Sequence, residues 1–521
     1  MSGTFVSFHQ CNNIEQHYFI TLDNLQVVSL PTLPAATYPS HHGGQGHNFN
    51  VTLTTEKGPS SHSSRETLKE AVEIAPTSKV WEGYEDDELP HKTNNRAIRN
   101  LRHKIFSIYR RIFGVIFVVN LSIFIATAVR GADANDLGLI VVANLFCAIL
   151  MRQEYVVNSF FVVFGNIPRS FPLWIRRLSA RVFHIGGIHS GCAVSGTVWL
   201  ILFLYRATWE LLNDGPTTLP TVVVSYVIIA LLLVMVVTAY PRFRHLYHNH
   251  FEVFHRFFGW TATALVWCQV LLLVNDYRPA EQSLGQAALH AVPFWMILII
   301  TVSIILPWIR LRKFEVRSTV LSDHAVLLRL NYVTPGPGSF TRMSLSPLTE
   351  WHTFATIAGP PEAKEPRGYS AIVSRAGDWT SALIANPPTR IWIRGLPTYG
   401  FMYLVPMFRR VLIVATGSGI APCTSHLLKK KIPLRLLWVA PNIQKTYGSE
   451  FVDTVLGAEP GAVVYDTREH GKPDVVKLTY RMVREFDAEA VFIVSNPKLT
   501  QKVVYGLMSR GIPAFGAIWD S

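Results

Sequence analysis

The sequence is poor in charged residues and in cysteine. Charged residues account for 16% of the 521 positions and hydrophobic residues for 49%, and the mean hydropathy is positive. A chain with so little charge is typical of a membrane protein with a soluble part. The five cysteines are scattered, without disulfide spacing or a CxxC pair, so neither a disulfide-bonded secreted scaffold nor a zinc site is indicated.

Acidic residues are also scarce, and the formal net charge is +13. The Lys and Arg residues lie beside apolar runs, so we relate this charge to orientation in a membrane and expect no nucleic-acid partner. The N-terminus has no basic segment followed by an apolar one, so it does not resemble a cleaved signal peptide.

Long apolar runs are the main feature of the first three hundred residues. Six runs carry little or no charge: 112–129, 137–151, 182–205, 220–240, 257–275 and 283–309. Five of them approach or exceed the ~18–20 residues that cross about 30 Å of hydrocarbon. The segment before them, 91–111, has seven Lys or Arg and no acid, which predicts a cytosolic side. We therefore expect six membrane spans, a lipid bilayer as partner and both termini in the cytosol.

The pattern of apolar and polar residues changes after the last apolar run. Short alternating strands separated by Gly/Pro turns predict an antiparallel β-barrel, and from residue 405 apolar strands alternate with helical stretches, which predicts an α/β doubly wound domain. The predicted parts are a disordered cytosolic N-terminal tail, a basic juxtamembrane segment, a six-span transmembrane domain, the barrel and the α/β domain, at 1–90, 91–111, 112–309, 314–402 and 405–521.

The strongest local motif is "VLIVATGSGIAPCTSHLL" at 411–428. A buried strand runs into Thr416-Gly417-Ser418-Gly419, and a helix opens near Pro422. Glycines allow the backbone to approach a pyrophosphate, and a helix N-terminus offers free N–H groups to it. This predicts a dinucleotide site. Cys423 either lines the nicotinamide site or is a small buried residue.

Two further motifs lie in the expected barrel. "EWHTFATI" (350–357) places a ring and hydroxyls on one strand, and "AGDWTSAL" (376–383) offers backbone N–H groups beside Thr380. Such N–H groups suit phosphate oxygens.

The order of these motifs resembles the ferredoxin reductase-type flavin and NAD(P)H module. Together with six spans and inward histidines, the chain resembles the ferric reductase and NADPH oxidase superfamily. The stretches 465–485, 494–506 and 510–521 resemble fungal TmpA-type transmembrane flavoproteins.

The resemblance implies cofactors and roles for individual residues. It implies FAD, and NADPH or NADH. The residues implied to line the flavin or hold its pyrophosphate are His352, Phe354, Thr356, Gly377, Asp378, Trp379 and Thr380. Thr416, Gly417, Ser418, Gly419, Pro422 and Asn496 are implied to bind NAD(P)H, and Ser495, Asn496 and Trp519 to serve hydride transfer.

The sequence departs from the superfamily pattern in three places. Ala355 stands where a hydroxyl usually bonds the flavin, and Ser495-Asn496-Pro497 replaces a Cys-Gly-Pro turn. The outer pair of haem ligands is also missing. One haem b between His189 and His255 remains open, with His184 as the alternative ligand; the competing interpretation is a set of neutral histidines bonded to nearby carbonyls.

From these features we expect a membrane-anchored NAD(P)H-dependent flavoprotein oxidoreductase. It would pass electrons through FAD to a small-molecule acceptor, without carrying them across the membrane. Two alternatives stay open: a transmembrane ferric reductase or an oxidase that makes superoxide or hydrogen peroxide, and a non-catalytic membrane regulator. Protein partners are not predicted.

Overall fold

The computed structural model describes residues 18–20, 27–29, 80–358 and 367–517. Residues 6–76 form a unit separate from the rest, and within it the structure describes one antiparallel strand pair, β1 (Tyr18–Ile20) and β2 (Val27–Ser29). The predicted disordered tail otherwise lies outside the described residues up to residue 79. Residues 80–90, which the sequence analysis assigned to that tail, belong to the other unit, together with the residues up to 521.

A short N-terminal segment precedes the long helices. It contains a 3₁₀ turn (Tyr84–Asp86), helix α1 (Arg96–Asn100) and one turn of π-helix (Leu101–Ile105). The side chain of Asn95 accepts a hydrogen bond from the N–H of Ile98, which caps α1 and fixes where it begins.

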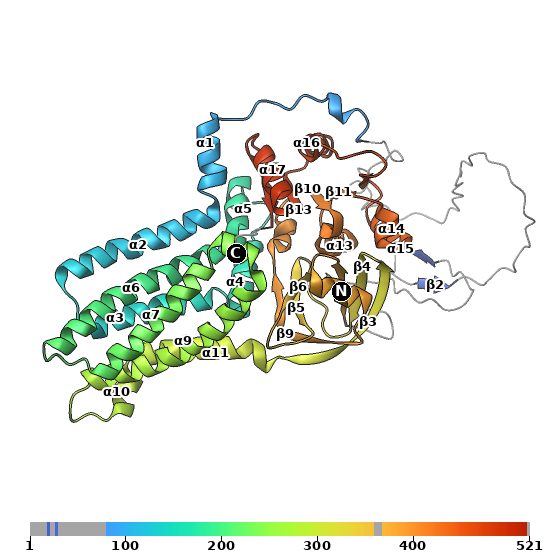
Figure 1. The fold of residues 1–521 in the computed structure, drawn as a ribbon. Coiled ribbons are helices and arrows are strands. Elements are labelled where there is room, and N and C mark those ends of the chain that lie inside the picture. The colour runs from blue at the N-terminus through green and yellow to red at the C-terminus, as the bar shows by residue number, and fades with distance from the viewer. Residues whose placement is uncertain (1–17, 21–26, 30–79, 359–366, 518–521) are drawn as a thin grey trace, which may run out of the picture. The chain divides into compact units, whose positions relative to one another are not determined.

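The helical domain follows, and Figure 1 shows its long helices running side by side. Its helices are α2 (Ile108–Arg130), α3 (Ala134–Leu150), α4 (Glu154–Gly165), α5 (Leu173–Ser179), α6 (Gly186–Leu212), α7 (Leu219–Thr238), α8 (Pro241–Leu246), α9 (His248–Tyr277), α10 (Leu284–His290) and α11 (Val292–Ile309). Close approach of α2 to α6 depends on small residues, because a Cβ at Gly187 or Gly191 would meet Ile112 or Ile116. A buried carboxylate, Glu210 of α6, accepts hydrogen bonds from the backbone of α3 and from Tyr277 of α9.

Five helices of the described chain are long and apolar enough to cross a membrane: α2, α6, α7, α9 and α11. The pair α3 and α4 is bent by 69°, and counting it as one span would raise the number to six. This finding concerns length and composition only, and it does not confirm the predicted six-span bundle.

Two predicted spans also differ in detail. The run 182–205 begins with a separate 3₁₀ turn (Ala180–His184), so His184 precedes helix α6. The run 283–309 is divided at Ala291, because α11 starts anew there with a proline in its first turn.

The bend between α3 and α4 has an identifiable cause. The side chain of Gln153 caps α4 by accepting hydrogen bonds from Tyr155 N (2.6 Å) and Val156 N (3.2 Å). The next residue, Glu154, is 4% exposed, pairs with Arg342 and accepts a hydrogen bond from Leu396 N at 2.7 Å. A carboxylate that is buried with these partners holds α4 against the sheet that follows.

That sheet has seven antiparallel strands. The sequence predicted antiparallel strands here, but as a barrel, whereas the strand order has two edge strands. The order of the sheet is β6-β5-β9-β3-β4-β8-β7. The strands are β3 (Arg312–Ser322), β4 (Ala325–Leu330), β5 (Ser339–Ser344), β6 (His352–Ala355), β7 (Ile357–Ala358), β8 (Tyr369–Ser374) and β9 (Arg390–Tyr399). Helix α12 (Asp378–Ala385) lies between β8 and β9, and a 3₁₀ helix (Phe401–Met407) leads onward. Tyr369, Leu328 and Met343 are among its fully buried core residues.

The last domain is a parallel sheet of five strands in the order β12-β11-β10-β13-β14. The strands are β10 (Val411–Thr416), β11 (Leu434–Ala440), β12 (Val463–Asp466), β13 (Ala490–Val494) and β14 (Ala514–Gly516). The helices are α13 (Ile420–Lys429), α14 (Ile443–Tyr447), α15 (Ser449–Ala458), α16 (Val475–Phe486) and α17 (Pro497–Met508). One face packs α13 and α15 and the other packs α16 and α17, so the strands are buried on both faces and read as continuous apolar runs.

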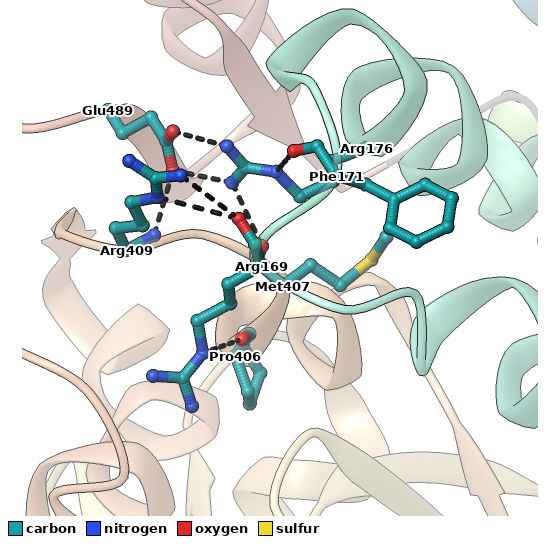
Figure 2. A network of polar contacts seen from close by, with 7 residues as sticks. All are labelled: Arg169, Phe171, Arg176, Pro406, Met407, Arg409 and Glu489. Carbon is teal, nitrogen blue, oxygen red and sulfur yellow. Dashed lines mark hydrogen bonds and ion pairs between the residues drawn. The ribbon is translucent and has the colours of Figure 1, made fainter.

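An ion pair joins the helical domain to this parallel sheet, as Figure 2 shows. Arg176 of α5, 1% exposed, makes two hydrogen bonds to the carboxylate of Glu489, at 2.6 and 2.5 Å. The guanidinium also donates to the carbonyls of Phe171 and Met407, and the N–H of Arg409 donates to Glu489 at 2.8 Å. Other hydrogen-bonding groups of this pair also have partners. A buried ion pair with such bidentate geometry holds its two elements in one orientation.

Candidate functional site

The strand order of the parallel sheet reverses between β10 and β13. Chain connections leave the sheet in opposite directions on the two sides of such a point, and ligands of doubly wound folds bind in the crevice outside the carboxyl ends of the strands there. The predicted motif 411–428 lies at this place: β10 leads into a 3₁₀ turn, Gly417–Gly419, and then into α13.

Glycine is required at two positions of this turn. Gly417 has a φ of +54°, a left-handed conformation that side chains with a Cβ rarely adopt. A Cβ at Gly419 would overlap the carbonyl oxygen of Val494, the last residue of β13. The turn and the end of β13 therefore approach each other as closely as a backbone without a side chain allows.

Hydroxyl groups connect the two strand ends. Thr416 Oγ1 and Ser495 Oγ lie 2.6 Å apart, and Thr500 Oγ1 donates to the carbonyl of Ser495 at 3.1 Å. The side chain of Asn496 caps α17 by accepting a hydrogen bond from Leu499 N at 3.0 Å. The N-termini of α13 and α17 thus lie at the same edge of the sheet, where their positive dipole ends favour an anion.

Behind the turn stands Trp438, which the sequence analysis did not single out. Its indole N–H donates to the carbonyl of Gly417 at 3.1 Å, and its ring packs against Tyr447 and Phe451. The residue is fully buried. A tryptophan inside the apolar run "LRLLWVA" signals only a core position, so its bond to the turn emerges only from the fold.

Cys423 of α13 lies in the core rather than in the crevice. It is fully buried, and its thiol donates to the carbonyl of Gly419 at 3.1 Å. Burial raises the pKa of this thiol. Of the two interpretations left open, the small buried residue is the one that agrees with the structure. Pro422 occupies the first turn of α13, and Ser418 is exposed at the tip of the turn.

The aromatic residues predicted for the barrel do come together. The ring of Trp379 stacks on His352, with centroids 4.1 Å apart, and on Phe354 at 5.8 Å. Glu350 accepts a hydrogen bond from the indole of Trp379 at 2.8 Å and lies 3.4 Å from His352 Nε2. Trp379 therefore packs against both other rings, and one carboxylate contacts Trp379 and His352.

The polar residues of the barrel motifs mostly serve the protein itself. Thr356 is 1% exposed, and its hydroxyl lies 2.7 Å from that of Ser339. The hydroxyl of Thr380 accepts hydrogen bonds from Ala376 N and Gly377 N at 2.8 and 3.0 Å. Two of the N–H groups expected to meet phosphate oxygens are therefore bonded internally, and Asp378 begins helix α12 beside them.

Helix α13 ties the barrel to the parallel sheet. Ser425 donates to the carbonyl of Thr356 at 2.9 Å and accepts from Ala358 N at 3.0 Å. The neighbouring His426 is 4% exposed, and burial lowers its pKa to about 4, so the imidazole is neutral. The strand with the stacked rings and the helix after the glycine turn are thereby fixed to each other.

The histidines of the helical domain divide into a pair and a single residue. The rings of His189 and His255 have centroids 6.5 Å apart, and His189 Nδ1 lies 2.8 Å from the carbonyl of Ala148. His184 packs instead against Phe183. Within the described residues no group of three or more His, Cys, Asp or Glu is placed to hold a metal ion. Trp519, predicted to serve hydride transfer, lies outside the described residues.

Comparison with known proteins points to one group of enzymes. A family model described as "Adenylate-forming reductase 03009, C-terminal domain" matches residues 401–521. Adenylate-forming reductase 03009 of Coprinopsis cinerea is 54% identical over 484 residues, covering 93% of this chain and 46% of the relative. Adenylate-forming reductase 06235 of the same fungus is 55% identical over 444 residues, covering 85% of this chain and 43% of the relative. The chain thus spans less than half the length of each of these relatives.

Solved structures are similar only at a distance. A ferredoxin NADP+ reductase from Neisseria gonorrhoeae with bound FAD and NADP has 17% identity and a TM-score of 0.33, and covers 40% of this chain and 98% of its own. CYP116B46 from Tepidiphilus thermophilus has 18% identity and a TM-score of 0.34, and covers 39% of this chain and 28% of its own. Similarity of this degree carries no argument about function.

The curated relatives overturn the resemblance drawn from the motifs. The family model and both relatives bear the name of adenylate-forming reductases, not of TmpA-type flavoproteins or the ferric reductase and NADPH oxidase superfamily. The predicted membrane-anchored flavoprotein activity, the ferric reductase or oxidase alternative and the regulator alternative are corrected with it. The physical reason is that a glycine turn after a strand and a small barrel recur in reductases of different chemistry, because fold does not determine function.

The predicted cofactors and location are corrected by the same relatives. FAD and haem b do not agree with adenylate-forming reductases, whereas NADPH alone does. The predicted integral membrane location, with six spans and cytosolic termini, also conflicts with these relatives. The prediction of a reductase agrees with their name in this coarser form.

Proposed function

We propose that this chain forms the NADPH-binding, reducing part of an adenylate-forming reductase. The proposal rests on one observation: the glycine turn Thr416–Gly419 lies at the switch point of the parallel sheet, bonded through Thr416 to Ser495 at the end of β13. It is supported by the names of the two relatives, which combine adenylate formation with reduction.

The residues around the turn have distinct roles in this proposal. Gly417, Ser418 and Gly419 present the backbone to the pyrophosphate, and Pro422 lies in the first turn of the helix whose free N–H groups face it. Ser495 and Asn496 border the nicotinamide end. Lys445, exposed on α14 after the neighbouring strand, is positioned for a 2′-phosphate. NADPH supplies a hydride when it is bound.

The substrate follows from the chemistry named in the relatives. A carboxylate that has been converted to an adenylate, or passed from there to another leaving group, carries an activated acyl carbon. NADPH would supply a hydride to that carbon and become NADP+, the bond to the leaving group would break, and an aldehyde would result. The leaving group would depart with its electron pair and take up a proton from water. The small-molecule partner of the chain is, in this proposal, an activated acyl compound, and the chain's own residues orient NADPH beside it and exclude water.

A reduction assay tests the proposal. Purified full-length chain is mixed with NADPH and an acyl adenylate or acyl thioester, and the fall in NADPH absorbance is measured together with the aldehyde formed. We expect the amount of NADPH consumed to equal the amount of aldehyde formed, and both amounts to be smaller with Ser495→Ala. NADPH that binds tightly and is never consumed with any acyl compound would contradict the reducing role while leaving the dinucleotide site standing.

A further inference from the structure

A polar cavity of about 370 Å³ lies where the N-terminal segment crosses the end of α17. Its lining residues are Leu89, Pro90, His91, Lys92, Arg99 and Arg510. Three of these side chains are cationic at neutral pH, one is a histidine and none is acidic. A cavity of this size is within the usual range of small-molecule sites, about 300–1,000 Å³. We refer to it as the basic pocket.

The two walls of the basic pocket are fixed to each other by hydrogen bonds to backbone carbonyls. Arg510 donates to the carbonyl of Pro90 at 2.8 Å and to that of Gly506 at 2.9 Å. Thr93 N donates to the carbonyl of Ser509 at 2.8 Å. The segment that carries the histidine and the lysine is therefore held against the last turn of α17, and the pocket is a built feature of the fold.

The cations gather around one aromatic ring. Arg99 Nε donates to the hydroxyl of Tyr505 at 3.4 Å, and the ammonium groups of Lys92 and Lys104 lie 5.3 and 5.1 Å from the centre of its ring. The face of an aromatic ring attracts a cation, but it carries no net charge that would balance three of them. An anion bound among these groups would relieve their mutual repulsion.

The acid that acts on Arg510 already has other partners. Asp474 acts on Arg510 electrostatically, but its carboxylate caps α16 by accepting from Val476 N at 3.0 Å and lies 3.9 Å from Lys502. The positive charge of the basic pocket is therefore left for a ligand. The pocket lies at the opposite end of α17 from Asn496, and the helix between them is about 18 Å long. It is distinct from the dinucleotide turn.

We propose that the basic pocket binds the phosphate group of a phosphate ester, from either a soluble compound or a lipid headgroup. A phosphate monoester carries about −1.5 to −2 charges at neutral pH and has three strong acceptor oxygens. Guanidinium groups match these oxygens with paired N–H donors, and an ammonium adds a point charge. Bound phosphate would join Lys92 and Arg99 of the N-terminal segment to Arg510 of α17.

Titration calorimetry with the full chain tests this site. The probes are inorganic pyrophosphate and, separately, phosphatidylcholine vesicles with and without phosphatidic acid. Lys92→Gln removes an ammonium group that lies over the ring of Tyr505. We expect its affinity to fall about tenfold, as for one charge-assisted hydrogen bond. Arg484→Gln, an exposed charge on the neighbouring α16, is the matched control and should bind like the wild type.

The two probes distinguish the source of the phosphate. Pyrophosphate affinity that falls in Lys92→Gln supports the pocket and a soluble ligand. Phosphatidic acid binding that falls in this variant, without any pyrophosphate binding, supports the pocket and a lipid headgroup. Arg510→Gln should also lower the affinity. It additionally removes two hydrogen bonds from the Arg510 side chain to backbone carbonyls. If Arg510→Gln does not fold, Lys92→Gln alone decides. Absent binding of both probes, or binding that Lys92→Gln leaves unchanged, would overturn the proposal.

Discussion

Thr416 Oγ1 lies 2.6 Å from Ser495 Oγ, so one hydrogen bond joins the carboxyl ends of two neighbouring parallel strands. The two residues are 79 positions apart in the chain. Their contact ties together the two strand ends at which the proposed dinucleotide binds.

Replacing this threonine with valine should weaken NADPH binding. Thr416→Val keeps the shape of the side chain and removes one hydrogen bond, worth about 1 kcal/mol, so we expect a roughly fivefold higher Kd for NADPH. NADPH fluorescence titration measures it. Thr454→Val in α15, which also loses a hydroxyl bonded within the protein, is the control and should leave the Kd unchanged.

The indole of Trp438 should matter to the turn beyond its place in the core. Trp438→Phe preserves most of the buried ring and removes the bond to Gly417, which leaves that carbonyl without its partner. We expect about 1–3 kcal/mol less stability together with weaker NADPH binding. Chemical denaturation and the NADPH titration measure the two effects. Reduced stability with an unchanged Kd would mean that Trp438 does not position the turn.

The Arg176–Glu489 pair should make stability depend on pH. Burial raises the pKa of Glu489, but hydrogen bonds from Arg176 and from the N–H of Arg409 outweigh burial, and the net pKa is lowered. The folded state therefore binds this proton less readily than the unfolded state. The stabilisation is fully present above the ordinary carboxyl pKa and is lost as the pH falls through the lowered folded value.

Glu489→Gln should remove this pH dependence and cost about 2 kcal/mol of stability at neutral pH, because Arg176 stays buried with its charge. Denaturation midpoints from neutral to acidic pH measure both effects. The control, Glu485→Gln, removes an exposed carboxylate 3.4 Å from Arg481 and should change stability by less than about 1 kcal/mol. Parallel pH profiles for wild type and Glu489→Gln would show that the ion pair is not responsible.

His426 should destabilise the fold in mild acid. Its pKa falls from the ordinary 6.5 to about 4 because it is buried. Above pH 6.5 both the folded and the unfolded state are neutral, so the residue has no effect there. Below that value the unfolded state takes up the proton first, and stability should fall by up to about 1.4 kcal/mol per pH unit until the pH approaches 4.

Substitution separates this effect from other acid-sensitive groups. His426→Gln cannot take up the proton, so its stability should decline less steeply with falling pH than that of the wild type. His324→Gln, which changes an exposed histidine, should keep the wild-type slope. Equal slopes in all three proteins would contradict the assignment.

Local sequence pattern predicted antiparallel strands after residue 314 and a parallel α/β sheet after residue 405, and both are present. The run "VLIVAT" forms β10, as its short length, its β-branched residues and the glycine after it predict, and the turn after it lies where the strand order reverses. The antiparallel strands after residue 314 were predicted from a different pattern, the period-two alternation of apolar and polar residues. The packing of α4 against the sheet was not predicted, since the partners of the buried Glu154, Arg342 and Leu396, lie about two hundred residues later in the chain.

Family identity was the part that local motifs misjudged. Gly417 and Gly419 indicate a close approach of the backbone, and His352 and Trp379 indicate packed rings. Neither pattern determines which reaction the protein carries out. Similarity to the two relatives over 484 and 444 residues contains information from hundreds of positions that no motif holds. Trp438 and Glu489 were missed for a different reason: their partners lie far away in the chain, and only the fold brings them together.

The most direct test of the account compares two glycines by calorimetric titration with NADPH. Gly419→Ala places a Cβ against the carbonyl of Val494 at the proposed dinucleotide turn, whereas Gly457→Ala, in α15, adds a Cβ with nothing near it. We predict that wild type and Gly457→Ala bind NADPH with the same Kd and that Gly419→Ala, although folded, binds at least about tenfold more weakly. Folded Gly419→Ala that binds NADPH as tightly as the wild type, or a wild type that does not bind NADPH, would contradict the account.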